Sequence, residues 1–248
     1  MTGQEGATDT DIIPEYANRF GSSPAVTENY IYTGNFNGEV LALSRDGDKE
    51  WGYSTDGHVR SSPTIADDNI LIGSYDYSLY NIDRFSGSLN WKFDTGGFIY
   101  SSPTVVDGQV YFGSLDFNSR SEELSYAVDL ESGESEWTLE IDGIAGTTIV
   151  HSDDLFFGTW EGTVYRVTTG GSVVWTKEVE GDVAGSTATD GTHLIVPTRD
   201  GRLYSINNES GSVEWEFKAN DEFYGVTPVI ADGVVYVGNN GPQYTYGD

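Results

Sequence analysis

The sequence contains no cysteine and few basic residues, and each shortage excludes a class of site. Without cysteine the chain has no disulfide, no thiolate metal ligand and no cysteine nucleophile. Lysine and arginine together number 12, against 40 aspartates and glutamates in 248 residues. Nucleic-acid phosphates are bound by a basic surface, so nucleic acid is not an expected partner.

Long apolar runs are also missing. No stretch approaches the roughly 20 apolar residues of a membrane-spanning helix, so no transmembrane segment is predicted. No charged region followed by an apolar run occurs near Met1, so the chain shows no signal or anchor, although a processed or recombinant start would hide one.

The excess of acidic residues is the most unusual bulk property. The formal net charge is −28 in 27.1 kDa. Such self-repulsion destabilises a compact protein at low ionic strength, whereas at 1 M salt the screening length falls to about 3 Å. We interpret the acidic surface as adaptation to a hypersaline environment, with an ordinary acidic protein as the alternative. Sixteen tyrosines, 11 phenylalanines and six tryptophans argue against disorder.

A unit of about 40 residues occurs six times, and a repeat of this period indicates a repeat architecture. Three copies begin with Ser-Ser-Pro and three with a degenerate version of it. The six starts are Ser22–Val26, Ser61–Ile65, Ser101–Val105, Gly146–Val150, Gly185–Thr189 and Val226–Ile230. Two further apolar runs follow each start, and five copies then end in a tryptophan strand. These tryptophans are Trp51, Trp91, Trp137, Trp175 and Trp215.

Four short strands per unit at this period predict one propeller blade per repeat. The fold class is therefore all-β: a six-bladed β-propeller of four-stranded antiparallel blades, forming a single domain over residues 1–248. The blades start near residues 22, 61, 101, 146, 185 and 226. The small Ser-Ser-Pro residues suit the crowded central channel. Each tryptophan is expected in the outer strand, covering the seam between blades.

Closure of the ring requires an additional strand. The sixth copy stops after its third run, Gln243–Tyr246, and lacks a tryptophan strand. We predict that residues 10–17 supply the outer strand and close the ring, because closure removes exposed sheet edges. The alternative is that the chain is part of a larger, eight-bladed propeller.

The repeat motif carries a family resemblance over residues 22 to 246. The third copy reads Ser-Ser-Pro-Thr-Val-Val-Asp-Gly from Ser101, and elsewhere Leu79-Tyr-Asn-Ile-Asp83 precedes Ser86-Gly and Trp91. This pattern resembles the PQQ-like (quinoprotein-type) repeat. The family includes quinoprotein alcohol dehydrogenases and non-enzymatic propellers, and its habit favours an extracytoplasmic or cell-surface location. The resemblance implies the fold and not an activity.

The resemblance raises the question of a cofactor. The dehydrogenases of the family are eight-bladed. They hold the quinone beside a vicinal disulfide, with calcium bound by Glu, Asn and Asp. A chain without cysteine cannot form that disulfide, and no calcium ligand or catalytic residue maps onto a motif here. We therefore predict no catalytic residue and no cofactor. A PQQ-dependent oxidoreductase with calcium, or a remnant of one, is the alternative.

Metal sites are not predicted either. His58 belongs to one rim of the propeller and His151 and His193 to the opposite rim, so the three cannot share an ion. Acidic turns such as Asp67-Asp68 and Asp107-Gly108 lack the calcium-loop pattern. They are interpreted as tight turns.

One rim is rich in aromatic and arginine side chains, the residue types that dominate protein-binding hot spots. In each blade, the loop before the inner strand and the loop between the second and third strands open on this rim. The residues that we expect to bind a protein or cell-surface macromolecule are His58, Arg60, Tyr75, Phe98, Tyr100, Trp160, Arg199, Phe223 and Tyr224. The same loops contain Phe36 and a six-residue insertion within 116–124.

Overall fold

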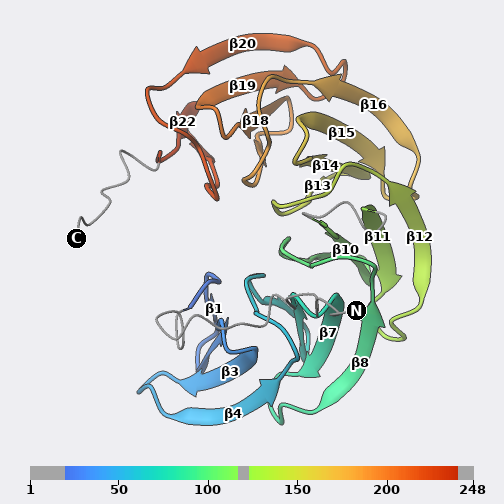
Figure 1. The fold of residues 1–248 in the computed structure, drawn as a ribbon, viewed down its shortest axis with the longest axis vertical. Coiled ribbons are helices and arrows are strands. Elements are labelled where there is room, and N and C mark those ends of the chain that lie inside the picture. Colours follow the sequence, from blue (N-terminus) through green and yellow to red (C-terminus); the bar gives the residue numbers. More distant parts are fainter. Residues whose placement is uncertain (1–19, 117–122, 240–248) are drawn as a thin grey trace, which may run out of the picture.

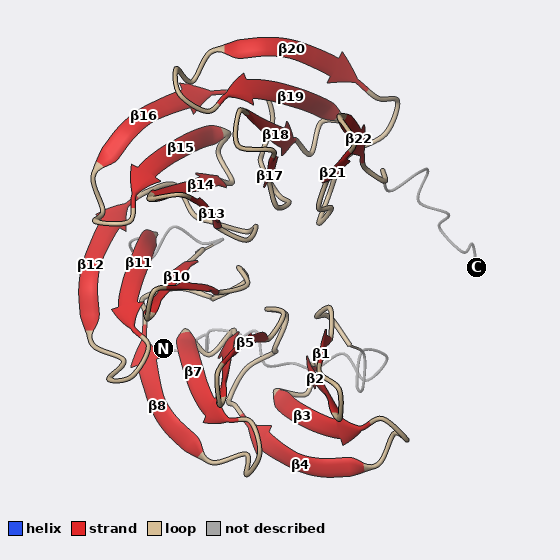
Figure 2. Ribbon diagram, turned by 180° about the vertical axis from the view of Figure 1, so that it is seen from behind, coloured by secondary structure: helices blue, strands red, loops and turns tan. Residues whose placement is uncertain are grey.

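The structure is a computed structural model that describes residues 20–116 and 123–239. All secondary-structure elements in these ranges are β-strands. Five four-stranded antiparallel sheets follow one another along the chain, and a two-stranded sheet comes last. Figure 1 shows them as blades arranged around an axis, and Figure 2 gives the same arrangement from behind. The predicted propeller of six repeats is confirmed.

In each blade the strands run in sequence order from the axis outwards. The inner strands are β1 (Ala25–Val26), β5 (Thr64–Ala66), β9 (Thr104–Val106), β13 (Ile149–His151), β17 (Ala188–Thr189) and β21 (Val229–Ala231). The second strands are β2 (Tyr30–Gly34), β6 (Asn69–Gly73), β10 (Gln109–Gly113), β14 (Asp154–Gly158), β18 (His193–Pro197) and β22 (Val234–Tyr236).

The outer half of each blade is made by two longer strands. The third strands are β3 (Glu39–Ser44), β7 (Ser78–Asp83), β11 (Leu124–Asp129), β15 (Thr163–Thr168) and β19 (Arg202–Asn207). The outer strands are β4 (Lys49–Ser54), β8 (Leu89–Asp94), β12 (Ser135–Glu140), β16 (Val173–Glu178) and β20 (Val213–Lys218).

The inner strands begin about three residues later than the sequence motif suggests. The Ser-Ser-Pro residues themselves are irregular, because proline cannot donate to a sheet ladder. Their hydroxyls replace the missing ladder bonds. Ser101 Oγ, for example, donates to Gly113 O at 2.9 Å and accepts from Gly113 N at 3.0 Å. This serine therefore stabilises the blade itself.

Four of the five outer-strand tryptophans cover the seams between blades, as predicted: Trp51, Trp91, Trp137 and Trp175. Trp51 Nε1 donates to Arg84 O of the following blade at 2.9 Å, and its ring packs against Gly87 there. A β-bulge shifts the register next to the tryptophan in all five four-stranded blades, as between Ala42 and Leu43. Bulges increase the local twist, which helps to turn the tryptophan towards the next blade.

The hydrophobic core lies between neighbouring blades. In one cluster, Tyr32 and Val40 of the first blade pack with Ile70, Ile72 and Ile82 of the second, all fully buried. No blade buries both of its faces by itself, so the repeats are stable only when stacked. The last four-stranded blade shows the consequence: every residue of β20 is exposed, and Trp215 is 41 % exposed.

The acidic turns have the geometry of tight turns. Asp107 and Gly108 both have positive φ, at 49° and 78°, as do Asp232 and Gly233. Aspartate and glycine tolerate this left-handed conformation, which two-residue hairpin turns require. In the described ranges, no three His, Asp or Glu side chains gather as a metal site.

The sixth blade is described only in its inner half. It contributes two strands, β21 and β22, to the described structure. Its predicted third run, 243–246, and the predicted closing strand, 10–17, lie outside the described residues. Exposed apolar side chains remain at both ends of the described arc: Phe20, Val26, Val229, Val234 and Tyr236.

Candidate functional site: an aromatic and arginine rim

The two sets of loops that were predicted to share a rim are joined by backbone hydrogen bonds. In the second blade Tyr75 N donates to His58 O at 2.9 Å. In the fifth blade Arg199 N donates to Asp182 O at 2.8 Å. These bonds hold the loop before the inner strand against the loop after the second strand. Aromatic and basic residues from distant repeats therefore lie at one end of the channel, and we call this surface the rim.

One half of the rim is built around Arg60. Its guanidinium carbon lies 4.8 Å from the centre of the Phe36 ring, 5.7 Å from Tyr75 and 5.6 Å from Tyr100. Arg60 Nη1 also donates to the Tyr75 hydroxyl at 3.1 Å. Cation–π contacts of this kind contribute about 0.5–2 kcal/mol each, more when water is excluded. The three rings thus hold the arginine in one position.

Further rings extend this half. The His58 ring meets Phe36 edge-on at 5.4 Å and lies 6.0 Å from Tyr75, and its Nδ1 contacts the Phe36 carbonyl oxygen. Phe98 lies 4.9 Å from Tyr75 but is only 7 % exposed. Phe98 therefore supports the rim from below.

The other half of the rim is built around Arg199. Its guanidinium carbon lies 5.8 Å from the Trp160 ring and 5.6 Å from the Tyr224 ring, and these two rings meet edge-on at 6.3 Å. Arg199 also pairs with Asp182 and Glu222 at 3.6 Å each. Its charge is therefore neutralised locally, unlike that of Arg60.

Two tyrosines from the third and sixth repeats connect the halves. Burial raises the pKa of Tyr100, and the neighbouring Tyr224 raises it further. Burial also raises the pKa of Tyr75 above its ordinary value. The hydroxyls of Tyr75 and Tyr100 are therefore neutral hydrogen-bonding groups at physiological pH.

Most of the predicted site residues meet in these two groups. His58, Arg60, Tyr75, Phe98 and Tyr100 lie in one, and Trp160, Arg199 and Tyr224 in the other. Phe223 is 2 % exposed and packs with Ile195 and Leu203, so it belongs to the core beneath the rim. Phe36 forms a wall of the Arg60 cluster, although the sequence marked it only as one of several loop aromatics.

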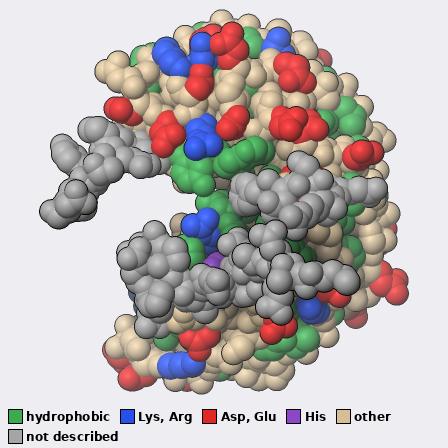
Figure 3. Space-filling view, viewed as in Figure 1, with side chains coloured by type: hydrophobic (Ala, Val, Ile, Leu, Met, Phe, Trp, Pro, Cys, Tyr) green, Lys and Arg blue, Asp and Glu red, His purple; other side chains and the backbone are tan. Residues whose placement is uncertain are grey.

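The surroundings of the rim are acidic. Figure 3 shows hydrophobic and basic side chains around the central opening, with aspartates and glutamates over the periphery. Part of the insertion in the third repeat, residues 117–122, lies outside the described residues. On its flanks, Glu123 Oε1 accepts a hydrogen bond from Asp116 N at 2.7 Å, and burial raises the pKa of Glu123.

The family follows from the sequence match. A family model described as outer membrane protein assembly factor BamB matches residues 2–101 and 160–246, well over half of the chain. The chain belongs to this family. The match confirms the predicted PQQ-like repeat resemblance. The two matched segments are separated by residues 102–159, which contain most of the third repeat and its insertion. No curated protein matches the chain.

Solved structures confirm the fold. BamB from Moraxella catarrhalis aligns with a TM-score of 0.77 and 19 % identity, covering 89 % of this chain and 71 % of that one. A europium-containing methanol dehydrogenase aligns with a TM-score of 0.67 and 16 % identity, covering 79 % of this chain.

A quinohemoprotein alcohol dehydrogenase from Pseudomonas putida HK5 gives a TM-score of 0.67 at 19 % identity, covering 79 % of this chain. The chain spans 50 % and 41 % of the two dehydrogenases. At these identities the likeness shows the propeller fold alone. No helix in the described ranges has the length and hydropathy of a membrane span.

Proposed function

We propose that the chain is a non-catalytic binding propeller that captures a partner protein through the rim, in an extracytoplasmic compartment. The main support is that two arginines, each held among aromatic rings, lie at one end of the channel. The chain around them has a net charge of −28. The family description, an outer membrane protein assembly factor, supports both the protein partner and the location.

The rim has the physical character of a protein-binding hot spot. Tyrosine, tryptophan and arginine supply large contact areas and lose little conformational entropy when they are already held in place. The Arg60 and Arg199 clusters are preorganised in this sense by their ring contacts. A partner segment that crosses the rim would contact both clusters, because Tyr100 beside Arg60 and Tyr224 beside Arg199 lie at the same end of the channel.

The test is affinity capture from a native high-salt extract with a double variant, Tyr100→Ala with Tyr224→Ala. We expect the double variant to capture about tenfold less partner than the wild-type chain, or less still, because two central rings are removed. Phe85→Ala is the matched control, since Phe85 is 54 % exposed beside Arg84 on the opposite rim. Equal capture by the double variant, with an unchanged circular dichroism spectrum, would overturn the proposal.

The quinone alternative has less support in the residues of the channel. The cavity on the axis is lined by glycine, alanine, serine, threonine, one arginine and one tyrosine. None of these described lining residues is a carboxylate that could hold calcium, and none is a tryptophan. We therefore propose that no quinone cofactor is bound. Adding PQQ with Ca²⁺ should shift neither the quinone absorbance nor the melting temperature, and a saturable shift of both would favour the oxidoreductase.

A further inference from the structure

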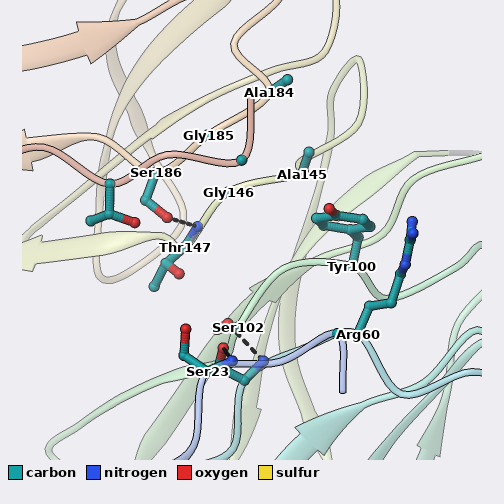
Figure 4. Close-up of a pocket in the computed structure, with 14 residues that line it drawn as sticks. Ser23, Arg60, Tyr100, Ser102, Ala145, Gly146, Thr147, Ala184, Gly185 and Ser186 are labelled. Atoms are coloured by element: carbon teal, nitrogen blue, oxygen red, sulfur yellow. Dashed lines mark hydrogen bonds between the residues drawn. The ribbon is translucent and has the colours of Figure 1, made fainter. Parts of the chain in front are cut away.

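The channel contains a small polar cavity to which all six repeats contribute. Its volume is about 160 Å³, similar to a cavity that holds benzene. Its lining residues come from the loops that precede the six inner strands: Gly21, Ser23, Arg60, Ser62, Tyr100, Ser102, Ala145, Gly146, Thr147, Ala184, Gly185, Ser186, Gly225 and Thr227. Figure 4 shows Arg60 and Tyr100 on one side and Gly146, Thr147, Gly185 and Ser186 on another.

Three serine hydroxyls in this lining have protons to donate. Ser62 Oγ accepts from Ser23 N, Ser102 Oγ accepts from Ser62 N and Ser186 Oγ accepts from Thr147 N, each at 3.0 Å. A hydroxyl has one proton in addition to its lone pairs. Among the described residues these three hydroxyls donate to no acceptor, so their oxygens are engaged and their protons are free.

Arg60 adds more donors and a positive charge. A guanidinium has five N–H donors, and only the bond to the Tyr75 hydroxyl uses one within the described structure. Arg60 forms no ion pair with any described carboxylate, although the chain has 40 acidic residues. It is also the only charged residue in the described lining. The cavity therefore holds an excess of donors beside one unpaired cation.

From this donor set we infer that the cavity is a carboxylate-binding site, with Arg60 as the charged anchor and the serine hydroxyls as further donors. A carboxylate accepts through two oxygens in the geometry of a guanidinium fork. The volume admits a carboxylate with a short chain, such as an acidic side chain, a chain terminus or a small organic acid. A phosphate dianion is disfavoured, because repulsion by the acidic chain grows with ligand charge.

The inference deepens the proposed function and rests on it for the source of the ligand. When a partner segment lies on the rim, one of its carboxylates enters the cavity beside Arg60. A free organic acid offers the same chemistry. The two sources differ in whether a small carboxylate competes with partner capture.

The first experiment uses the whole chain without a partner. Sodium propionate is titrated at constant ionic strength, and the NMR signals of the Arg60 side chain and the Ser102 and Ser186 amides are followed. We expect saturable shifts whose dissociation constant rises about tenfold or more in Arg60→Gln and by less in Arg60→Lys, which keeps the charge but loses the fork. Arg84→Gln is the matched control, because Arg84 also lies on a ring, Phe85, but away from the cavity.

Absence of saturable binding, or equal binding by Arg60→Gln with an unchanged melting curve, would overturn the site. Tighter binding of inorganic phosphate than of propionate would overturn the carboxylate class. Propionate that weakens partner capture supports a segment-borne carboxylate, whereas binding that leaves capture unchanged supports a free acid. If the tyrosine double variant loses partner capture but the wild-type chain does not bind propionate, the carboxylate site is wrong and the proposed function still stands.

Discussion

The indole nitrogen of Trp137 donates a hydrogen bond to the carbonyl oxygen of Thr169 in the following blade, at 2.8 Å. The same bond recurs at three other seams, from Trp51, Trp91 and Trp175 at 2.9 Å each. Each indole also packs on a glycine of the next blade, as Trp137 does on Gly171. These contacts link neighbouring repeats that share no continuous sheet.

Replacing Trp137 by phenylalanine should weaken one seam. The ring keeps most of its packing, but the Thr169 carbonyl loses its donor. We expect the free energy of unfolding to fall by about 1–2 kcal/mol. Urea unfolding followed by fluorescence measures the change. Trp215→Phe is the control, because Trp215 is 41 % exposed and its indole bonds no other described residue. Equal losses in both variants would contradict the seam argument.

Gly73 ends β6 where the backbone passes close to the next blade. A Cβ atom there would lie 2.2 Å from Ile99 Cγ2. Gly73→Ala should therefore reduce the free energy of unfolding by about 1–3 kcal/mol, as other overpacked cores do. Gly238 holds the same position in the sixth repeat with nothing described within 4 Å, so Gly238→Ala should be neutral or slightly stabilising. Thermal unfolding of both variants tests this, and similar losses would be evidence against the close approach.

His193 connects two carboxylates at the rim opposite the candidate site. Its Nδ1 lies 2.9 Å from Asp190 Oδ2 and its Nε2 lies 3.1 Å from Glu214 Oε2. The hydrogen bond with Asp190 raises the pKa of His193. Burial opposes the change at Asp190, but the bonds from His193 lower the Asp190 pKa to about 2.

These shifts set the direction of the pH dependence. Because the His193 pKa is raised on folding, its stabilisation is complete below the unfolded value of about 6.5 and disappears as pH rises through the folded value. The Asp190 contribution is present above about pH 4 and is lost as pH falls towards about 2. Melting temperatures of the wild type and His193→Gln should differ most near pH 5 and converge in alkali. A constant difference up to pH 9 would exclude the ion pairs as its source.

The predicted closing strand can be tested by two truncations. Removing residues 1–19 deletes the predicted strand at 10–17, and removing residues 1–9 keeps it. We expect the longer deletion to lower the melting temperature and the shorter one to leave it nearly unchanged, because an open ring exposes sheet edges. If both truncated chains have the melting temperature of the full chain, the predicted closing role of this segment is wrong.

Salt should stabilise the chain. With a net charge of −28, screening between about 0.1 and 2 M NaCl removes most of the self-repulsion. The melting temperature should rise over this range. A variant with Glu50, Glu134 and Glu136 changed to glutamine, all exposed positions, should show a smaller rise. An identical salt dependence in this variant would point away from electrostatic screening.

Only part of the candidate site was readable from the sequence. The loops of the rim follow from strand order, so Arg60, Tyr75 and Tyr100 could be assigned to one surface. Which side chains point outwards could not be assigned, because loop residues lack the two-residue alternation of strands. The sequence therefore places Phe223 and Phe98 on the binding surface, whereas in the structure both are buried beneath it. The serine donors of the cavity cannot be predicted either, since Ser62 and Ser102 belong to the repeat motif and have no further signal in the sequence.

The sequence by itself determined the repeat, the all-β class, the number of blades and the tryptophan seams. These features are local: a period near 40, short alternating runs and a single bulky residue per unit are visible without any long-range contact. Only the tertiary structure decided that Arg60 meets three rings and no described carboxylate, and that serines from separate blades surround one cavity. Such contacts depend on how far each repeat rotates around the axis, and that rotation is set by packing between blades.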